Sequence, residues 1–318
     1  MLTYQFVTHF LVVVTQFFPG VLANGFIVVV NMVDFFKQRQ MAPLDLLLSC
    51  LATSRIILQV LIFLAHLSLV YFLKPSVLAK TSIIFMFVNV WGLWLATWLG
   101  VFYCAKIATI PHPLFFWLKR RISKSVPWLI LGCLLYASIC AGMNEKQRWS
   151  ITQNILANFL SRNATETKRL DIVSFSVLIF HVIVPLIIFL IAVLILIFSL
   201  WRHTQHRRTM ATGGSGPHRG ASFRALLSIL SFLFLYVSHY MMVIVLFFQM
   251  VQFDSFLFEF CTFIAGTYPS IHSVILILGH PKLKQKAKKF LLCTHCGHLS
   301  ILSHGYSFSI VTKDDADL

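Results

Sequence analysis

Long apolar stretches alternate with short polar segments along this chain of 318 residues. A helix needs about 20 mostly apolar residues to cross a bilayer, and only helices or closed barrels satisfy their backbone groups there. The stretches show no alternation of period two, which argues for helices. The pattern therefore predicts an all-α membrane protein with seven spanning helices, at 7–31, 43–65, 82–105, 127–143, 172–200, 224–249 and 257–279.

A short basic segment follows the seventh stretch. Residues 281–292 begin with a proline, which suits the first position of a helix. Apolar residues of this segment can share one helix face, with lysines on the other. This pattern predicts an amphipathic helix lying on the anionic inner leaflet. Residues 1–292 then form one seven-helix domain, and we expect residues 293–318 to be a disordered tail.

Charge and its distribution set the expected orientation. Hydrophobic residues make up 58% of the chain and charged residues 11%, so the apolar surface must face lipid. The net charge of +16 invites a nucleic-acid partner, but 18 of the 26 Lys and Arg residues fall on segments that share one side of the membrane. The positive-inside rule predicts an extracellular amino terminus and a cytoplasmic tail, without nucleic-acid binding. Asn163 begins a glycosylation sequon on an expected outer loop.

Arg55 lies near the middle of the second stretch, without an acidic residue clearly nearby. A charge at this depth costs a few kcal/mol on insertion scales, so the side chain either snorkels to an interface or faces the bundle. It lies some 12 residues from the start of its span, which argues for the bundle. We expect neutral partners, Asn24 and Ser273, and a polar hub that can hold two arrangements.

Asn89 is a second polar residue, in an aromatic part of the third stretch. It either bonds a neighbouring helix or contacts a ligand, and its place in the outer half of the helix favours the ligand. His181, His239 and Tyr240 are each equally compatible with a buried bundle residue and with a ligand contact. Together they can surround a cavity between helices, which is where small molecules bind in bundles.

Catalysis has no candidate residues. The chain shows no nucleophile with a base, no phosphate loop and no paired carboxylates, so we expect neither an enzyme nor a cofactor. Residues 293–298 contain two cysteines and two histidines, but one short tract is weak support for a metal, and lipidation of Cys293 and Cys296 fits better. No halves repeat, which counts against common transporters.

Several motifs resemble those of one family. The segments are Leu51–Gln59, Leu93–Ala108, His112–Lys119, Pro185–Thr204, and Tyr268–Gly279 followed by Lys282–Gln285. In combination they are similar to the type 2 (bitter) taste receptors, a branch of the G-protein-coupled receptors. Like those receptors, the chain has Phe102-Tyr103-Cys104 at the base of its third helix and no outer cysteine. It departs from many members at Phe85, where a Trp is common, and at His239, where a Tyr is common.

The resemblance implies a ligand site and a coupling surface. Small bitter compounds are expected to bind between the third, fifth, sixth and seventh spans, and a gustducin-type heterotrimeric G protein to dock at the inner end. The expected ligand contacts are Phe85, Asn89, Trp91, Phe180, His181, His239 and Tyr240, and the expected coupling residues are Tyr103, Lys106 and His112. Two alternative functions stay open. One is a seven-helix chemoreceptor for a ligand outside taste, and the other, which the sequence supports less well, is a transporter or channel. The oligomeric state stays open as well.

Overall fold

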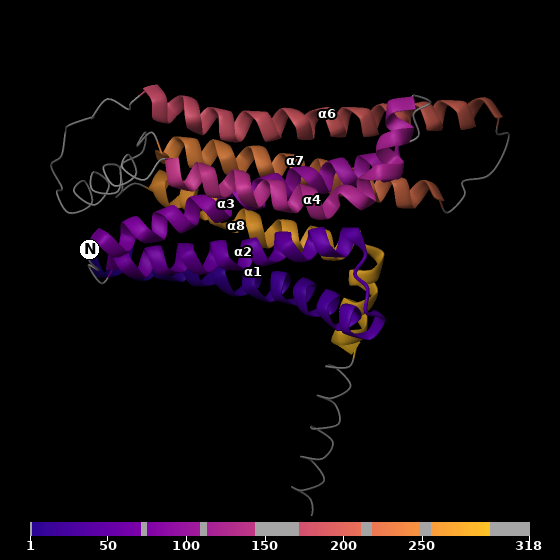
Figure 1. Ribbon diagram of the computed structural model, residues 1–318. Coiled ribbons are helices and arrows are strands. Elements are labelled where there is room, and N and C mark those ends of the chain that lie inside the picture. The colour runs from indigo at the N-terminus through magenta and orange to yellow at the C-terminus, as the bar shows by residue number, and fades with distance from the viewer. Residues whose placement is uncertain are drawn as a thin grey trace, which may run out of the picture. The chain divides into compact units, whose positions relative to one another are not determined.

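The computed structural model describes residues 2–70, 75–108, 113–143, 172–210, 218–247 and 256–292. All regular structure in these ranges is helical. The helices, labelled as in Figure 1, are α1 (Leu2–Gln38), α2 (Pro43–Val70), α3 (Pro75–Ile107), α4 (Pro113–Met143), α6 (Ile172–Met210), α7 (His218–Phe247) and α8 (Phe256–Gly279). Residues 281–292 are helical as well. The helices α6 and α8 contain the fifth and seventh predicted spans, and α7 contains residues 224–247 of the sixth. The last two residues of the sixth span lie outside the described part.

The helices extend beyond the apolar stretches that predict them. The helix α4 begins at Pro113, well before the predicted span at 127, and α6 continues to Met210. Hydropathy marks the part of a helix that meets hydrocarbon, whereas backbone hydrogen bonding continues into the headgroup region. Starts are better marked by proline, because α2, α3 and α4 each begin at one. Proline lacks the N–H that the first turn leaves unpaired anyway.

The chain divides into two compact units, residues 1–275 and 276–318. Within the first unit α1 packs on α2, α2 on α3 and α4, α3 on α4 and α6, and α6 on α7. Figure 1 shows α1 and α2 side by side along most of their length. In the second unit, the N–H groups of His280 and Lys284 donate to the carbonyls of Leu276 and His280, at 2.9 and 3.0 Å.

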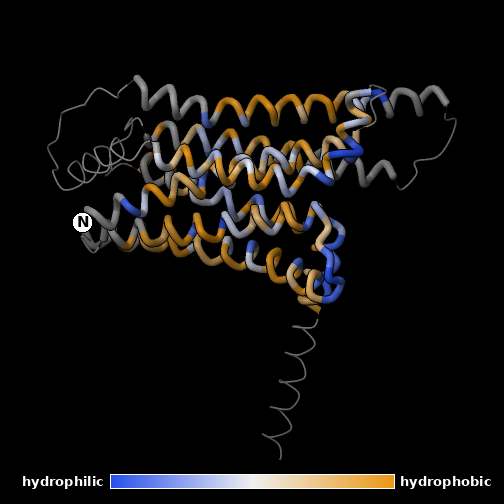
Figure 2. The backbone as a smooth tube through the Cα atoms, in the orientation of Figure 1, coloured by the Kyte–Doolittle hydropathy of each residue, from blue (hydrophilic) through white to orange (hydrophobic). Residues whose placement is uncertain are grey.

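The outward faces of the helices are apolar. Figure 2 shows hydrophobic residues along the middle of the helices and hydrophilic ones gathered near several helix ends. Leu22 on α1 is 70% exposed and Phe234 on α7 is 72% exposed, whereas Asn24 and Ser273 are fully buried. Among the described residues, four helical segments are long and apolar enough to cross a membrane: Phe10–Gln38, Pro43–Leu64, Lys80–Ile107 and Phe115–Gly142. Shorter apolar segments lie in α6 and α7, at Ile183–Ser199 and Ile229–Met242.

Candidate functional site

Arg55 projects from α2 into a polar cluster and is only 3% exposed. Its Nη1 donates to Ser273 Oγ at 3.4 Å, and its Nη2 donates to His272 Nδ1. The guanidinium also hydrogen-bonds Tyr268 and lies 5.6 Å from the centre of its ring. These contacts, all with α8, are to neutral groups. The geometry requires the His272 tautomer that carries its proton on Nε2, because an arginine can only donate.

Asn24 on α1 completes the predicted polar hub. Ser273 Oγ lies 2.6 Å from Asn24 Oδ1 and 2.8 Å from the carbonyl oxygen of Pro269, both acceptors. Asn24 Nδ2 donates to the carbonyl of Gly20 at 2.8 Å. The structure thus brings Asn24, Arg55 and Ser273 together and joins three helices through them. Such pairing is what a buried charge in a membrane needs, since unpaired polar groups there are costly.

Sequence reasoning missed two members of this cluster, Tyr268 and His272. They lie four residues apart on α8, so they share one helix face. That spacing, together with the neighbouring Ser273, was the available signal. We use the term extended hub for Asn24, Arg55, Tyr268, His272 and Ser273.

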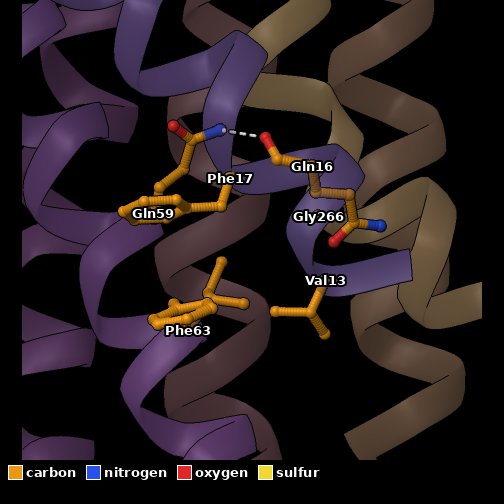
Figure 3. Close-up of a pocket in the computed structure, with 7 residues that line it drawn as sticks. Val13, Gln16, Phe17, Gln59, Phe63 and Gly266 are labelled. Atoms are coloured by element: carbon orange, nitrogen blue, oxygen red, sulfur yellow. Dashed lines mark hydrogen bonds between the residues drawn. The ribbon is translucent and has the colours of Figure 1, made fainter. Parts of the chain in front are cut away.

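A second polar layer lies one turn along α2 from Arg55. Gln59 Nε2 donates to Ser270 Oγ at 2.8 Å and to the carbonyl of Gln16 at 3.3 Å, the bond drawn in Figure 3. Gln16 Nε2 in turn donates to the carbonyl of Phe263 at 2.9 Å. We call Gln16, Gln59 and Ser270 the amide layer. It joins α1, α2 and α8 independently of Arg55, and sequence reasoning did not predict it.

The cavity beside the amide layer is too small for a drug-like ligand. Its volume is about 10 Å³, and Val13, Phe17, Phe63 and Gly266 contribute to its lining (Figure 3). That volume suits about one water molecule, whereas small-molecule pockets are usually about 300–1,000 Å³. This cavity is therefore not the site for a bitter compound.

Gly20 lets Gln59 of α2 lie close against α1, and Gly20→Ala is expected to destabilise the protein. A Cβ atom at Gly20 would overlap the amide of Gln59, which its hydrogen bonds hold in place. Overpacking costs about 1–3 kcal/mol, which exceeds the gain of about 0.5–1 kcal/mol from replacing a helical glycine with alanine. Gly25→Ala is the matched control, because nothing lies within 4 Å of its Cβ position. Thermal unfolding in detergent should give a lower midpoint for Gly20→Ala and an equal or higher one for Gly25→Ala; the same shift in both would contradict the overlap.

Three of the predicted ligand residues meet between α3, α7 and α8. The side-chain amide of Asn89 donates a hydrogen bond to the Tyr240 hydroxyl. His239, next to Tyr240 on α7, stacks on Tyr268 with ring centres 4.7 Å apart. His239 and Tyr240 are both 6% exposed. Phe85 precedes Asn89 by one turn on the same face of α3 and is 37% exposed.

Trp91 and His181 have other neighbours. Trp91 follows Asn89 by two residues, which turns its side chain about 200° away around the helix. It stacks on Phe87 at 6.2 Å, and Phe87 packs against the α2–α3 cluster of Leu58, Leu61 and Val88. His181 on α6 lies 5.7 Å from the ring centre of Tyr136 on α4. The side chain of Phe180 lies outside the described part of the chain.

An aromatic chain runs from Tyr240 to the extended hub. Tyr240 contacts Tyr236 with ring centres 4.8 Å apart, and Tyr236 contacts Phe232 at 5.9 Å. Phe232 stacks on His272 at 4.1 Å, and His272 hydrogen-bonds Arg55. The expected ligand contact Asn89 is thus connected to Arg55 through adjoining side chains of α7 and α8.

The expected coupling and modification sites are only partly described. Tyr103 is half-buried near the end of α3. Lys106 is exposed, with Nζ 5.6 Å from the centre of the Phe102 ring. His112, Asn163 and residues 293–318 lie outside the described residues. Within the described part, no three His, Cys, Asp or Glu residues are grouped so that they can hold a metal.

Comparisons with known proteins agree with the motifs. The family described as Taste receptor protein (TAS2R) matches residues 1–295. Taste receptor type 2 member 1 of Pongo pygmaeus is 51% identical over 300 residues, which cover 93% of this chain and 99% of that protein. Taste receptor type 2 member 119 of Mus musculus is 48% identical over 296 residues, which cover 92% of this chain and 88% of that protein. Taste receptor type 2 member 3 of Papio hamadryas is 36% identical over 310 residues, which cover 92% of this chain and 96% of that protein.

The segments 41–51 and 225–233 are similar to the member 1 receptors in particular, which accords with this match. The relatives are receptors, so the chain is not an enzyme. Its seven-helix membrane fold, read from the apolar stretches, is that of the same class. The chain belongs to the taste receptor type 2 family, and so to the bitter-sensing branch of the G-protein-coupled receptors.

Proposed function

We propose that this receptor binds small bitter compounds beside Asn89, between α3, α6, α7 and α8, and activates a gustducin-type G protein. The observation that carries the proposal is the hydrogen bond from Asn89 to Tyr240, because it places a polar ligand contact at the start of the aromatic chain. Phe85 and His239 are the proposed neighbours of the ligand. We propose the same site for Phe180, Trp91 and His181, although the last two have other neighbours here.

The proposed mechanism is competition for Asn89. We propose a ligand that accepts from the same Asn89 N–H that now donates to the Tyr240 hydroxyl, so that it replaces this bond. Tyr240 is then free to move, and its movement is passed through Tyr236 and Phe232 to His272. The ligand activates only if it binds the rearranged state more tightly than the resting one. The inner ends of α3, α6 and α7 then separate and open a surface for the G protein that includes Tyr103, His112 and the already exposed Lys106.

The proposed orientation places the receptor in the plasma membrane with its amino terminus outside. The excess of lysine and arginine on one side supports it. Asn163 then faces the lumen during synthesis, where it can be glycosylated, and the helix at 281–292 lies on the inner leaflet.

Calcium release in cells that express this chain with a gustducin-type or promiscuous G protein tests the function. A panel of bitter compounds should give saturable responses that untransfected cells lack. Silence at confirmed surface expression, across a broad panel, would instead favour a chemoreceptor for another ligand.

Asn89→Ala is expected to weaken agonist potency by about three- to tenfold. This is the effect of losing one hydrogen bond to the ligand, which contributes about 0.5–1.5 kcal/mol. Tyr240→Phe is the matched variant, because it removes the bond between the two residues while Asn89 stays available to the ligand. Dose–response curves at equal surface expression separate the two roles. Potency should fall in Asn89→Ala and hold or rise in Tyr240→Phe. An equal fall in both variants would make Asn89 a packing residue for Tyr240.

A further inference from the structure

One face of α4 carries aromatic and basic side chains in alternation. Trp117, Arg121, Lys124 and Trp128 follow one another at intervals of four, three and four residues, so they share a helix face. All four are exposed, Trp117 at 57% and Trp128 at 74%. The Arg121 guanidinium lies 5.2 Å from the centre of the Trp117 ring. Arg120 is exposed beside this strip.

The same face becomes apolar farther along the helix. Leu131, Leu135 and Ile139 continue the spacing and are also exposed, at 48%, 58% and 59%. The described residues of the chain therefore cover little of this face. The rise from Trp128 to Ile139 is about 16 Å at 1.5 Å per residue. One leaflet of the hydrocarbon core is about 15 Å thick, so the apolar part has the length of one leaflet.

The positive charge of this strip has no counter-charge on its own helix, since Pro113–Met143 contains no Asp or Glu. Tryptophan is enriched at the interface between headgroups and hydrocarbon, where one edge of its ring is wet and the rest is apolar. Basic residues at that level attract anionic lipids of the inner leaflet. From Arg121 onward the order along the face, from charge through Trp128 to leucine, matches the order of groups along a phospholipid.

We propose that this face of α4 binds an anionic phospholipid of the inner leaflet. Arg121 and Lys124, with Arg120 beside them, hold the negatively charged headgroup. Trp117 and Trp128 flank it, and an acyl chain lies along Leu131 and Leu135. The choice of leaflet rests on the proposed orientation, but the binding chemistry does not. An acidic protein surface would match the charges and leave the exposed apolar part of the face uncovered, which is why a lipid fits better.

Native mass spectrometry of the purified full-length receptor, titrated with phosphatidylserine or with phosphatidylcholine, tests the site. The wild-type chain should bind phosphatidylserine in preference to phosphatidylcholine. The double variant Arg121→Gln/Lys124→Gln should lose affinity for phosphatidylserine by about fivefold for each charge removed, the equivalent of about 1 kcal/mol per basic residue. The charge-preserving variant Arg121→Lys/Lys124→Arg should keep it.

Lys37→Gln/Arg39→Gln is the matched control, because it removes two exposed charges from the end of α1. Its affinity for phosphatidylserine should be unchanged. An equal loss in both charge-removing variants would overturn the site in favour of general surface attraction. Unchanged lipid binding with weaker G-protein activation in the α4 variant would overturn it in favour of an acidic protein partner. Since the titration needs neither agonist nor G protein, its outcome is independent of whether the proposed ligand site is right.

Discussion

Replacing Arg55 with methionine is expected to abolish most agonist-dependent signalling while leaving the receptor folded. Removing the charge relieves an insertion cost of about 2.5–3.5 kcal/mol. The main group left without its hydrogen-bond partner is His272 Nδ1, and this loss costs about 1–3 kcal/mol in stability. Ser273 keeps its contacts with Asn24 and Pro269. The two effects nearly cancel in stability. The extended hub, however, loses its contacts between α2 and α8, and with them the proposed bias between resting and active states.

Coupling energies of about 1–3 kcal/mol correspond to 5–150-fold, so the ratio of agonist-induced to basal activity should fall by at least fivefold. Calcium release at matched surface expression measures the signalling, and thermal unfolding in detergent measures the stability. Arg55→Lys should signal poorly as well, because one ammonium cannot reproduce the contacts of the guanidinium with Tyr268, His272 and Ser273. It should also be less stable than Arg55→Met, because it keeps the buried charge.

Ile57→Met, on a more exposed part of the same helix, controls for effects on insertion and trafficking. It should match the wild-type chain in both measurements. Wild-type signalling by Arg55→Met would reduce the hub to packing and would leave the amide layer as the main connection between α1, α2 and α8.

The fold of this chain could be predicted from its sequence, because an apolar run of 20 or more residues has few alternatives in water or in a membrane. The helix ends could not be predicted in the same way. Pro113 begins α4 well before the lipid-facing part, and α6 continues through basic residues to Met210. Hydropathy indicates whether lipid or water surrounds a helix, whereas the positions of its ends depend on caps and local hydrogen bonds.

The hub and the ligand site show what sequence reasoning can and cannot supply. A lone charge in a span must find polar partners, which points to Asn24 and Ser273 as the nearest candidates on other helices. The amide layer gave no comparable signal, since neutral glutamines are tolerated in many environments. The resemblance gives both Asn89 and Trp91 as ligand contacts, whereas helix geometry turns the two side chains to opposite sides of α3. Side-chain direction requires the period of the helix and the position of its neighbours.

Gly100→Ala is expected to destabilise the receptor by about 1–2 kcal/mol and to disturb signalling. A Cβ atom there would lie 2.6 Å from Cδ2 of Phe189 and closer still to Cε2. Phe189 is 1% exposed and packs edge-on against Phe232 with ring centres 4.7 Å apart, so the ring has little room to move. Overpacking of about 1–3 kcal/mol therefore outweighs the gain of about 0.5–1 kcal/mol that alanine brings to a helix.

The disturbance should reach the hub, because Phe232 also stacks on His272. Phe189→Leu in the Gly100→Ala background should restore part of the stability, since the smaller side chain makes room for the methyl group. A double-mutant cycle in thermal unfolding measures that coupling. Gly132→Ala on α4, with nothing within 4 Å of its Cβ position, is the control and should be neutral or stabilising. Additive effects of Gly100→Ala and Phe189→Leu would show that α3 and α6 do not meet at this pair, and the route from Phe189 through Phe232 to the hub would lose its support.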